Sequence, residues 1–317
     1  STIDRGGIQF IADKSTIYNV NLHSRIGMHL LVKLFDFNAI DPDTLYNKIY
    51  NFNWQDLINP KQTFFIKIKG KSQFLGNNNY TTLKIKDAIV DKIKKIKFIR
   101  PSVSKNNPEI IISIFINDEK VSVYKDSSGV SLHKRGYRNK IHRAMLNESL
   151  AAGLIMLSNW NKVDPFYDMM CGSGTLPIEA ALMAYNIAPG LLRNQFSFQN
   201  WSDYDESLFS KLKHRAQENI KVNPNIKIYG FDVAFTNIAI SLSSIKLINL
   251  DKIVKFQKKD IKDFKPNESK GTIIINPPYG ERLNSSDQLE FLYKLIGDVL
   301  KNQCNGFDSY IFTSNLE

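Results

Sequence analysis

The chain has 317 residues, of which 43% are hydrophobic and 23% charged, and its formal net charge is +11. This composition excludes a disordered chain and fits a folded protein of two or three domains. The excess of Lys and Arg suits a polyanionic partner, because these cations neutralise phosphates. Codon bias toward Asn, Ile and Lys explains the same charge equally well.

The two cysteines, Cys171 and Cys304, lack the paired spacing of a disulfide framework or a zinc site, so we predict no metal and a reducing compartment. The longest apolar runs, such as "GLIMLSNW" and "GTIIINPP", are shorter than the roughly 18 residues that span a bilayer. The first residues contain no block typical of a signal peptide. We therefore expect a soluble, cytoplasmic protein without a membrane partner.

The first 140 residues alternate short strand-like and helix-like segments, which predicts a small α+β module. Asp41 followed by Pro42 is a typical helix start. Lysines are spread through the helix at 83–97 and through the strands, and form either a solvated face or a nucleic-acid surface. The expected strands are 6–12, 28–37, 64–70, 109–117 and 120–128, and the expected helices are 41–52 and 83–97.

From residue 141 onward, helical and strand patterns alternate regularly. This alternation predicts a parallel sheet covered by helices on both faces, with ligands bound beyond the carboxyl ends of the strands. The expected helices are 141–158, 175–187, 205–221, 234–247 and 287–301, and the expected strands are 163–169, 226–231, 253–257, 271–275 and 308–313.

The stretch "DMMCGSGT" at 168–175 places an acid at a strand end and two glycines in the turn before a helix. Gly172 and Gly174 permit a positive φ and the close approach of a ligand to the backbone. Pro177 breaks the full dinucleotide fingerprint G-x-G-x-x-G, and a tight turn without a ligand is the rival interpretation. Asp168 suits a cationic or hydroxyl-rich ligand better than a pyrophosphate.

Two more acids follow strands of the predicted sheet. Asp232, in "IYGFDVAF", could accept hydrogen bonds from ribose hydroxyls, or it could cap the next helix. Asp260, in "KKDIKDF", could meet an adenine amino group, although this indication is weaker on its own.

The stretch "TIIINPPYGERL" at 272–283 takes an apolar strand into Asn276, Pro277, Pro278 and Tyr279. The prolines remove two backbone donors and leave carbonyl acceptors. The Asn276 side-chain oxygen and the Pro277 carbonyl can accept both hydrogens of a planar exocyclic amine, while Tyr279 offers a ring for base stacking. A plain turn explains this sequence less well.

These elements, in this order, resemble those of methyltransferases that use S-adenosyl-L-methionine to modify amino groups. With "RGGIQF", "NLHSR", "LKIKDAIVD", "SLHKRGYR", "NESLAAG", "DMMCGSGTLPIEAALMAYNIAPGLLR", "FDVA" and "NPPYGERL", nearly the whole chain resembles the THUMP-containing ribosomal RNA guanine-N2 methyltransferases of the RlmL type. It departs at Met169, where the family more usually has proline.

The resemblance implies an α/β fold, with a Rossmann-like class I methyltransferase domain preceded by an α+β THUMP/ferredoxin-like module. It divides the chain into a remnant of an N-terminal ferredoxin-like domain at 1–40, a THUMP RNA-binding domain at 41–140 and the methyltransferase domain at 141–317. It also implies residues ahead of Ser1 and a closing β-hairpin after Glu317.

The resemblance further implies roles for single residues. Asn276, Pro277, Pro278 and Tyr279 would be catalytic and would act on a guanine N2 amine of RNA, with large-subunit ribosomal RNA as the expected substrate. Asp232 would hold the ribose of S-adenosyl-L-methionine and Asp260 its adenine edge. The other residues implied to bind the cofactor are Glu148, Asp168, Cys171, Gly172, Gly174, Thr175 and Asn276.

The stretch "SLHKRGYRNKIHR" at 131–143 mixes cations with aromatic rings, which suits phosphate contact and base stacking. As an isolated run it would more often be a solvated linker. Beside a THUMP-like module we expect it to contact RNA. The residues concerned are Lys134, Arg135, Tyr137, Arg138, Lys140 and Arg143.

Two other interpretations remain open at this point. DNA adenine-N6 or protein glutamine methylation would use the same Asn-Pro-Pro-Tyr chemistry with a different accessory domain. A catalytically silent RNA-binding factor is the alternative from another class, against which the intact Asp168, Gly172, Gly174 and Asn276 speak.

Overall fold

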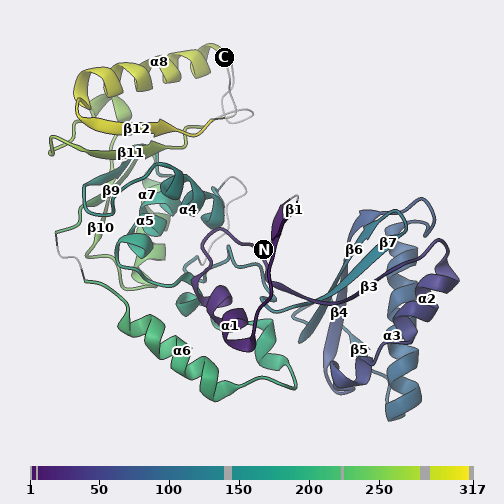
Figure 1. Cartoon of the computed structure of the whole chain (residues 1–317). Coiled ribbons are helices and arrows are strands. Elements are labelled where there is room, and N and C mark those ends of the chain that lie inside the picture. Colours follow the sequence, from purple (N-terminus) through teal and green to yellow (C-terminus); the bar gives the residue numbers. More distant parts are fainter. Residues whose placement is uncertain (1, 5, 139–144, 223–224, 279–285, 314–317) are drawn as a thin grey trace. The chain divides into compact units, whose positions relative to one another are not determined.

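The computed structural model describes residues 2–4, 6–138, 145–222, 225–278 and 286–313 (Figure 1). The chain divides into two compact units. Unit 1 comprises Ser1–Asn21, Met28–Ser131 and Asn194–Leu212. Unit 2 comprises Leu22–Gly27, Leu132–Arg193 and Lys213–Glu317.

Unit 1 is built around a five-stranded mixed sheet with the strand order β3-β7-β6-β4-β5. Strands β3, β7 and β6 pair antiparallel, whereas β4 is parallel to β6 and β5. The strands and helices are β3 Leu31–Asn38, α2 Pro42–Tyr50, η1 Trp54–Asp56, β4 Thr63–Lys71, α3 Asn78–Lys97, β5 Ser102–Val103, β6 Ile110–Asn117, β7 Lys120–Asp126 and η3 Ser197–Asn200.

Helices α2 and α3 cover one face of this sheet (Figure 1). Asp41 caps α2 by accepting hydrogen bonds from the Asp43 and Thr44 amides at 2.9 and 2.7 Å. The core beneath the helices is formed by alternate strand residues, among them Ile66 and Ile112, which are almost fully buried. Because successive side chains of a strand point to opposite faces, the apolar residues at every second position lie under the helices and the residues between them lie on the other face of the sheet.

Unit 2 contains a five-stranded sheet in the order β10-β9-β8-β11-β12, and all its pairs are parallel. The elements are α4 Glu148–Leu157, β8 Phe166–Asp168, α5 Thr175–Ala184, η2 Pro189–Leu192, β9 Ile228–Asp232, α7 Phe235–Lys246, β10 Val254–Lys258, η4 Ile261–Asp263, β11 Gly271–Ile275, α8 Ser286–Gln303 and β12 Phe307–Ile311.

Both faces of the unit 2 sheet are covered. Residues of α4, α5 and α7 pack with Phe166 and Ile274 on one face, and residues of α8 and η4 pack with Tyr167 and Ile273 on the other. Adjacent residues of one strand thus enter opposite cores, as expected for a parallel sheet between two helical layers.

Most expected elements are present, with differences that have local causes. The strand expected at 163–169 is shorter in the structure, where β8 spans Phe166–Asp168. The Asn161 side chain accepts hydrogen bonds from the Val163 and Asp164 amides and so forms a turn before the strand. In the described part of 141–158 the helix begins at Glu148, because the Asn147 side chain caps it.

Helix α1 (Lys14–His23) and strand β1 (Thr2–Asp4) were not expected, whereas β2 (Gly7–Gln9) lies within the expected strand 6–12 and α6 (Glu206–Glu218) lies within the expected helix 205–221. Helix α1 begins beside Asp13, whose side chain accepts the Thr16 amide at 2.7 Å. Strands β1 and β2 form an antiparallel pair. Across the described ranges, no helix is both long and apolar enough to cross a membrane.

Candidate active site

The turn between β8 and α5 is fixed by backbone hydrogen bonds and by two left-handed glycines. The Cys171 amide donates to the Phe231 carbonyl of β9 at 2.8 Å, and the Gly174 amide donates to the Cys171 carbonyl at 2.8 Å. Gly172 and Gly174 have φ of +53° and +79°, which L side chains rarely adopt. We call residues 169–174 the glycine loop.

The two glycines serve different purposes. A Cβ on Gly174 would lie 2.7 Å from the Phe256 ring and 2.9 Å from Ser241, so this glycine is required by packing. A Cβ on Gly172 would meet nothing within 4 Å, so the backbone there borders open space that a ligand can enter.

Asp232, at the end of β9, holds the glycine loop and the start of α7 together. One carboxylate oxygen accepts the Gly172 amide at 2.9 Å, and the other accepts the Ala234 amide at 2.8 Å and the Asn237 side-chain amide at 3.0 Å. A carboxylate offers about four acceptor positions. Asp232 therefore retains a free acceptor position on the oxygen that accepts the hydrogen bond from the Gly172 amide.

Asp168, at the end of β8, is a buried carboxyl with 1% exposure. Its side chain accepts the Met170 amide at 3.1 Å. Burial raises its pKa to about 8, the Met170 hydrogen bond opposes this shift, and the nearby Asp232 charge adds to it. The site thus holds a carboxyl that a bound cation would convert to its ionised form.

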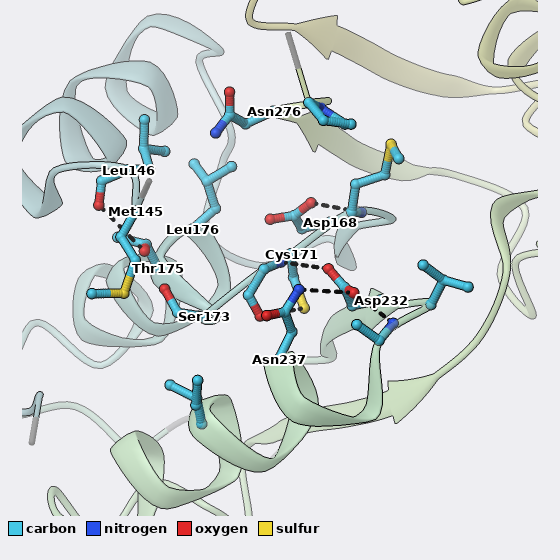
Figure 2. A pocket seen from close by; sticks show the side chains of 16 residues that line it. Met145, Leu146, Asp168, Cys171, Ser173, Thr175, Leu176, Asp232, Asn237 and Asn276 are labelled. Carbon is cyan, nitrogen blue, oxygen red and sulfur yellow. Dashed lines mark hydrogen bonds between the residues drawn. The ribbon is translucent and has the colours of Figure 1, made fainter. Parts of the chain in front are cut away.

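Asn276 follows β11, the strand adjacent to β8 in the sheet. Its side-chain oxygen Oδ1 is buried and has no hydrogen-bond partner among the described residues. A buried acceptor without a partner is costly, and its use by a ligand would remove that cost. Figure 2 shows Asn276, Asp168 and Asp232, from the ends of three neighbouring strands, around the same pocket.

The pocket has a volume of about 360 Å³, which lies in the range of small-molecule sites. It brings together seven of the predicted site residues: Asp168, Cys171, Gly172, Thr175, Asp232, Asn276 and Pro278. Its other lining residues are Met145, Leu146, Met170, Ser173, Leu176, Val233, Ala234, Asn237 and Ile240.

Four residues that were predicted to be catalytic or to bind the cofactor, and whose positions are described, do not line the pocket. Gly174 packs against Phe256 and Ser241, and Pro277 is buried. Glu148 pairs with Arg138 at 3.3 Å, and its burial raises its pKa against the opposing charge of Arg138. Asp260 caps η4 by accepting the Lys262 amide at 3.1 Å. Tyr279 lies outside the described residues.

Sequence reasoning missed Asn237, whose amide group donates to Asp232 inside the pocket. Asn237 lies in the first turn of the helix that follows Asp232. This position was a usable signal, because a helix that begins just after the carboxyl end of a strand has its first turn beside the ligand. Met145 and Leu146, which come from the segment before α4, gave no comparable signal.

The basic stretch at 131–143 requires a correction. Arg135 and Tyr137 are 1% and 0% exposed, so they have no surface to offer to RNA. Arg135 pairs with the buried Glu179 of α5 at 3.4 Å, and the Tyr137 hydroxyl donates to the same carboxylate at 3.2 Å. Their cationic and aromatic pattern therefore serves the interior of unit 2.

The other residues of this stretch differ from one another. Lys134 is exposed, whereas the Arg138 guanidinium donates to the Leu146 carbonyl at 3.2 Å and to the Thr175 hydroxyl. Arg138 thereby ties the segment before α4 to the first residue of α5. Lys140 and Arg143 lie outside the described residues.

A parallel sheet with a glycine loop, an acid on each of two adjacent strands and a pocket at their carboxyl ends defines a Rossmann-like ligand-binding domain. Residues 135–317 match the family model of the RMKL-like methyltransferase domain, and residues 39–126 match that of the THUMP domain. The chain belongs to the RMKL-like methyltransferase family and carries a THUMP domain ahead of the methyltransferase domain. The expected fold class is thus confirmed.

Individual relatives agree with this assignment. The Synechocystis sp. protein named "Putative RNA methyltransferase slr0064" is 34% identical over 309 residues, which are 98% of this chain and 80% of that protein. The crystal structure of SMU.472 complexed with SAH matches with a TM-score of 0.86 at 31% identity, over 95% of this chain and 80% of that one. A Listeria monocytogenes structure described as a "predicted N6-adenine-specific DNA methylase" matches with a TM-score of 0.85 at 29% identity, over 96% and 80%.

Proposed function

We propose that this protein transfers a methyl group from S-adenosyl-L-methionine to the exocyclic N2 amine of a guanine in RNA, with large-subunit ribosomal RNA as the substrate. The observation that carries the proposal is that Asn276 lines the pocket that also holds Asp168 and the glycine loop, while its buried Oδ1 has no hydrogen-bond partner among the described residues.

The pocket fits S-adenosyl-L-methionine in its charge and in its acceptors. SAH, bound to SMU.472, is what remains of this cofactor after methyl transfer. In our proposal Asp168 faces the positive charge of the methionine part, the free acceptor position of Asp232 takes a ribose hydroxyl, and Asp260 lies toward the adenine edge. Gly172 leaves the space for approach, and Cys171 and Thr175 line it. When bound, the cofactor supplies a methyl group on a sulfonium.

Asn276 and Pro277 would orient the amine. A guanine N2 lone pair is delocalised into the ring, so the amine is a poor nucleophile. An amine whose two hydrogens are accepted by Asn276 Oδ1 and the Pro277 carbonyl is held with its lone pair free, so positioning and electrostatics supply the rate gain. The proton leaves through these acceptors or through water. Pro278 shapes the wall, and Tyr279 would stack the target base.

RNA is favoured as the substrate because the chain combines a THUMP domain with 34% identity to a protein named as an RNA methyltransferase. We accordingly assign 1–40 to a remnant of a ferredoxin-like domain, 41–140 to THUMP and 141–317 to the methyltransferase domain, in a cytoplasmic enzyme of ribosomal RNA processing. Lys134, Lys140 and Arg143 remain candidates for RNA contact.

The second candidate is methylation of adenine N6 in DNA. It is supported by the name of the Listeria monocytogenes structure, and an adenine amine would use the same two acceptors. The THUMP domain is the feature that favours RNA.

Incubation with S-adenosyl-L-methionine labelled on the methyl group tests the proposal. Ribosomal RNA, duplex DNA and protein are offered in parallel, and the modified nucleosides are identified by mass spectrometry. We expect label in N2-methylguanosine from ribosomal RNA. Label only in N6-methyladenine of DNA, or only in protein, would overturn the assignment, and absence of cofactor binding in calorimetry would support a catalytically silent RNA-binding factor.

A further inference from the structure

The sheet of unit 1 carries a second set of side chains on the face opposite α2 and α3. The strand pairing places Lys33, Tyr124, Ser113 and Lys67 in one row across this face. Side chains in a row across a sheet point to the same face, and every second residue of a strand does so. The next row on this face contains Asp36, Ser122, Phe115 and Lys69.

The neighbouring residues show that this is not the core face. Ile66, Ile112, Ile114 and Val123 alternate with the residues of these rows and are buried in the core beneath the helices. Phe115, by contrast, is 37% exposed although it lies in the middle of β6. We call this surface the lysine–aromatic face.

Two contacts bring a lysine and two rings together on the lysine–aromatic face. The Phe115 and Tyr124 rings meet edge to face with centroids 5.4 Å apart, and the Lys69 ammonium lies 5.8 Å from the Phe115 centroid. An aromatic ring beside lysines suits the binding of an unpaired nucleotide, because a base can stack on the ring and the ammonium groups can contact its phosphates.

A small hollow in this face adds a fixed polar group. It is lined by Lys67, Lys69, Phe115, His29 and Asp126, together with Leu31 and Ser113. Asp126 is 1% exposed, and its Oδ2 lies 2.9 Å from His29 Nδ1 and 3.7 Å from the Lys67 ammonium. The other oxygen accepts the Ser128 and Gly129 amides. Asp126 thereby orients His29 and Lys67 beside the ring.

We propose that the lysine–aromatic face binds an unpaired segment of the RNA substrate, with one base stacked on Phe115 and the flanking phosphates on Lys67 and Lys69. This inference rests on the proposed function, because it takes RNA as the substrate. The face lies within unit 1 and shares no residue with the methyl-transfer pocket of unit 2.

Matched variants of the whole chain test this assignment. The double variant Lys67→Gln/Lys69→Gln is compared with Lys94→Gln/Lys97→Gln, which removes the same charge from exposed positions of α3. Phe115→Ala removes the stacking ring and Phe115→Tyr keeps it. Fluorescence anisotropy with a labelled single-stranded 10-nucleotide RNA is measured from about 50 to 200 mM salt, the range over which phosphate contacts have a large effect.

Phe115→Ala is expected to weaken binding by about fivefold or more, and Phe115→Tyr to restore it. Lys67→Gln/Lys69→Gln should reduce the slope of log affinity against log salt by about 1.4, because each phosphate contact on a single strand contributes about 0.7. The proposal would be overturned if Phe115→Ala and Lys67→Gln/Lys69→Gln both bound RNA as the wild-type chain does. It would also be overturned if only Lys94→Gln/Lys97→Gln lost affinity. Equal losses for a fully paired RNA hairpin would also overturn it.

Methyl transfer and thermal unfolding by the same proteins separate the possible failures. If the wild-type chain methylates RNA while the face variants bind it normally, only this inference fails. If the wild-type chain binds and methylates no RNA, the proposed function fails. A variant with a lowered midpoint of thermal unfolding is replaced by Phe115→Leu or by the Lys→Met double variant, which remove the ring or the charge but keep much of the side-chain bulk.

Discussion

The two five-stranded sheets of this protein place their polar groups differently. In unit 1 helices cover one face, and lysines and aromatic rings stand on the opposite face. In unit 2 both faces are buried, and the pocket with Asp168, Asp232 and Asn276 lies at the carboxyl ends of the strands. The number of covered faces therefore decides where polar side chains can gather, on an open face in unit 1 and at the carboxyl ends of the strands in unit 2.

The substitution with the largest expected effect on the pocket of unit 2 is Asn276→Ala. We expect a fall of about 10² to 10³ in the rate of methyl transfer, because an acceptor that acts on the reacting group is lost. Cofactor affinity should stay nearly constant. Single-turnover rates and calorimetry with S-adenosyl-L-methionine measure the two quantities.

Asn237→Ala is the matched control, because it removes a second amide that lines the same pocket. Its contact is with Asp232, so it should weaken cofactor binding more than the rate at saturation. Equal loss of rate and affinity in both variants would mean that Asn276 has been assigned the wrong role.

Arg135→Met tests the interior of unit 2. The change leaves the buried Glu179 without its closest cation, so the free energy of unfolding should fall by about 3–5 kcal/mol. Lys134→Met, on the exposed neighbour, should change it by about 0.5 kcal/mol or less. Urea unfolding followed by circular dichroism measures both. If Arg135→Met were as stable as the wild-type chain but bound RNA more weakly, Arg135 would be an RNA contact, contrary to its burial.

The two glycines of the glycine loop should respond differently to alanine. Gly174→Ala brings a Cβ against Phe256 and Ser241 and should cost about 3 kcal/mol of unfolding free energy. Gly172→Ala meets no atom and should cost about 1 kcal/mol, from its positive φ alone. Its methyl group would enter the pocket, however, so it should weaken cofactor binding. Urea midpoints and calorimetry distinguish these outcomes, and equal effects on stability would contradict them.

A further test concerns pH and Asp168. Its pKa is raised to about 8 in the folded chain, whereas an unfolded Asp titrates near 4. Between these values the folded state binds more protons, so this group lowers the free energy of unfolding as pH rises from about 4 to 8. A cationic cofactor favours the ionised form, so its affinity should rise with pH toward 8 and its binding should release a proton.

Asp168→Asn should remove that proton release, which calorimetry in buffers of different ionisation enthalpy detects. The same variant should also show a flatter dependence of stability on pH. Persistent proton release would assign the titration to another group.

The sequence by itself determined the strands, the helices and the turns that join them in unit 2. β11 spans residues 271–275 as expected, because a short run of isoleucines favours a buried strand and the two prolines that follow Asn276 lack the N–H groups needed to continue it. Glycine spacing likewise located the loop, since a positive φ is a local requirement. Helix α1 was missed although Asp13 offered a capping signal, because its apolar residues follow no clear helical period.

Only the tertiary structure decided which polar residues are buried and which meet. Arg135 and Tyr137 look like surface residues in the sequence, and their partner Glu179 lies more than forty positions further along the chain. Asn276 and Asp168 are far apart in the chain and come to one pocket because β8 and β11 are adjacent. Local patterns fix backbone conformation through short-range sterics and hydrogen bonds. Burial and pairing of charges depend on which segments pack together, and this is settled by the sheet order.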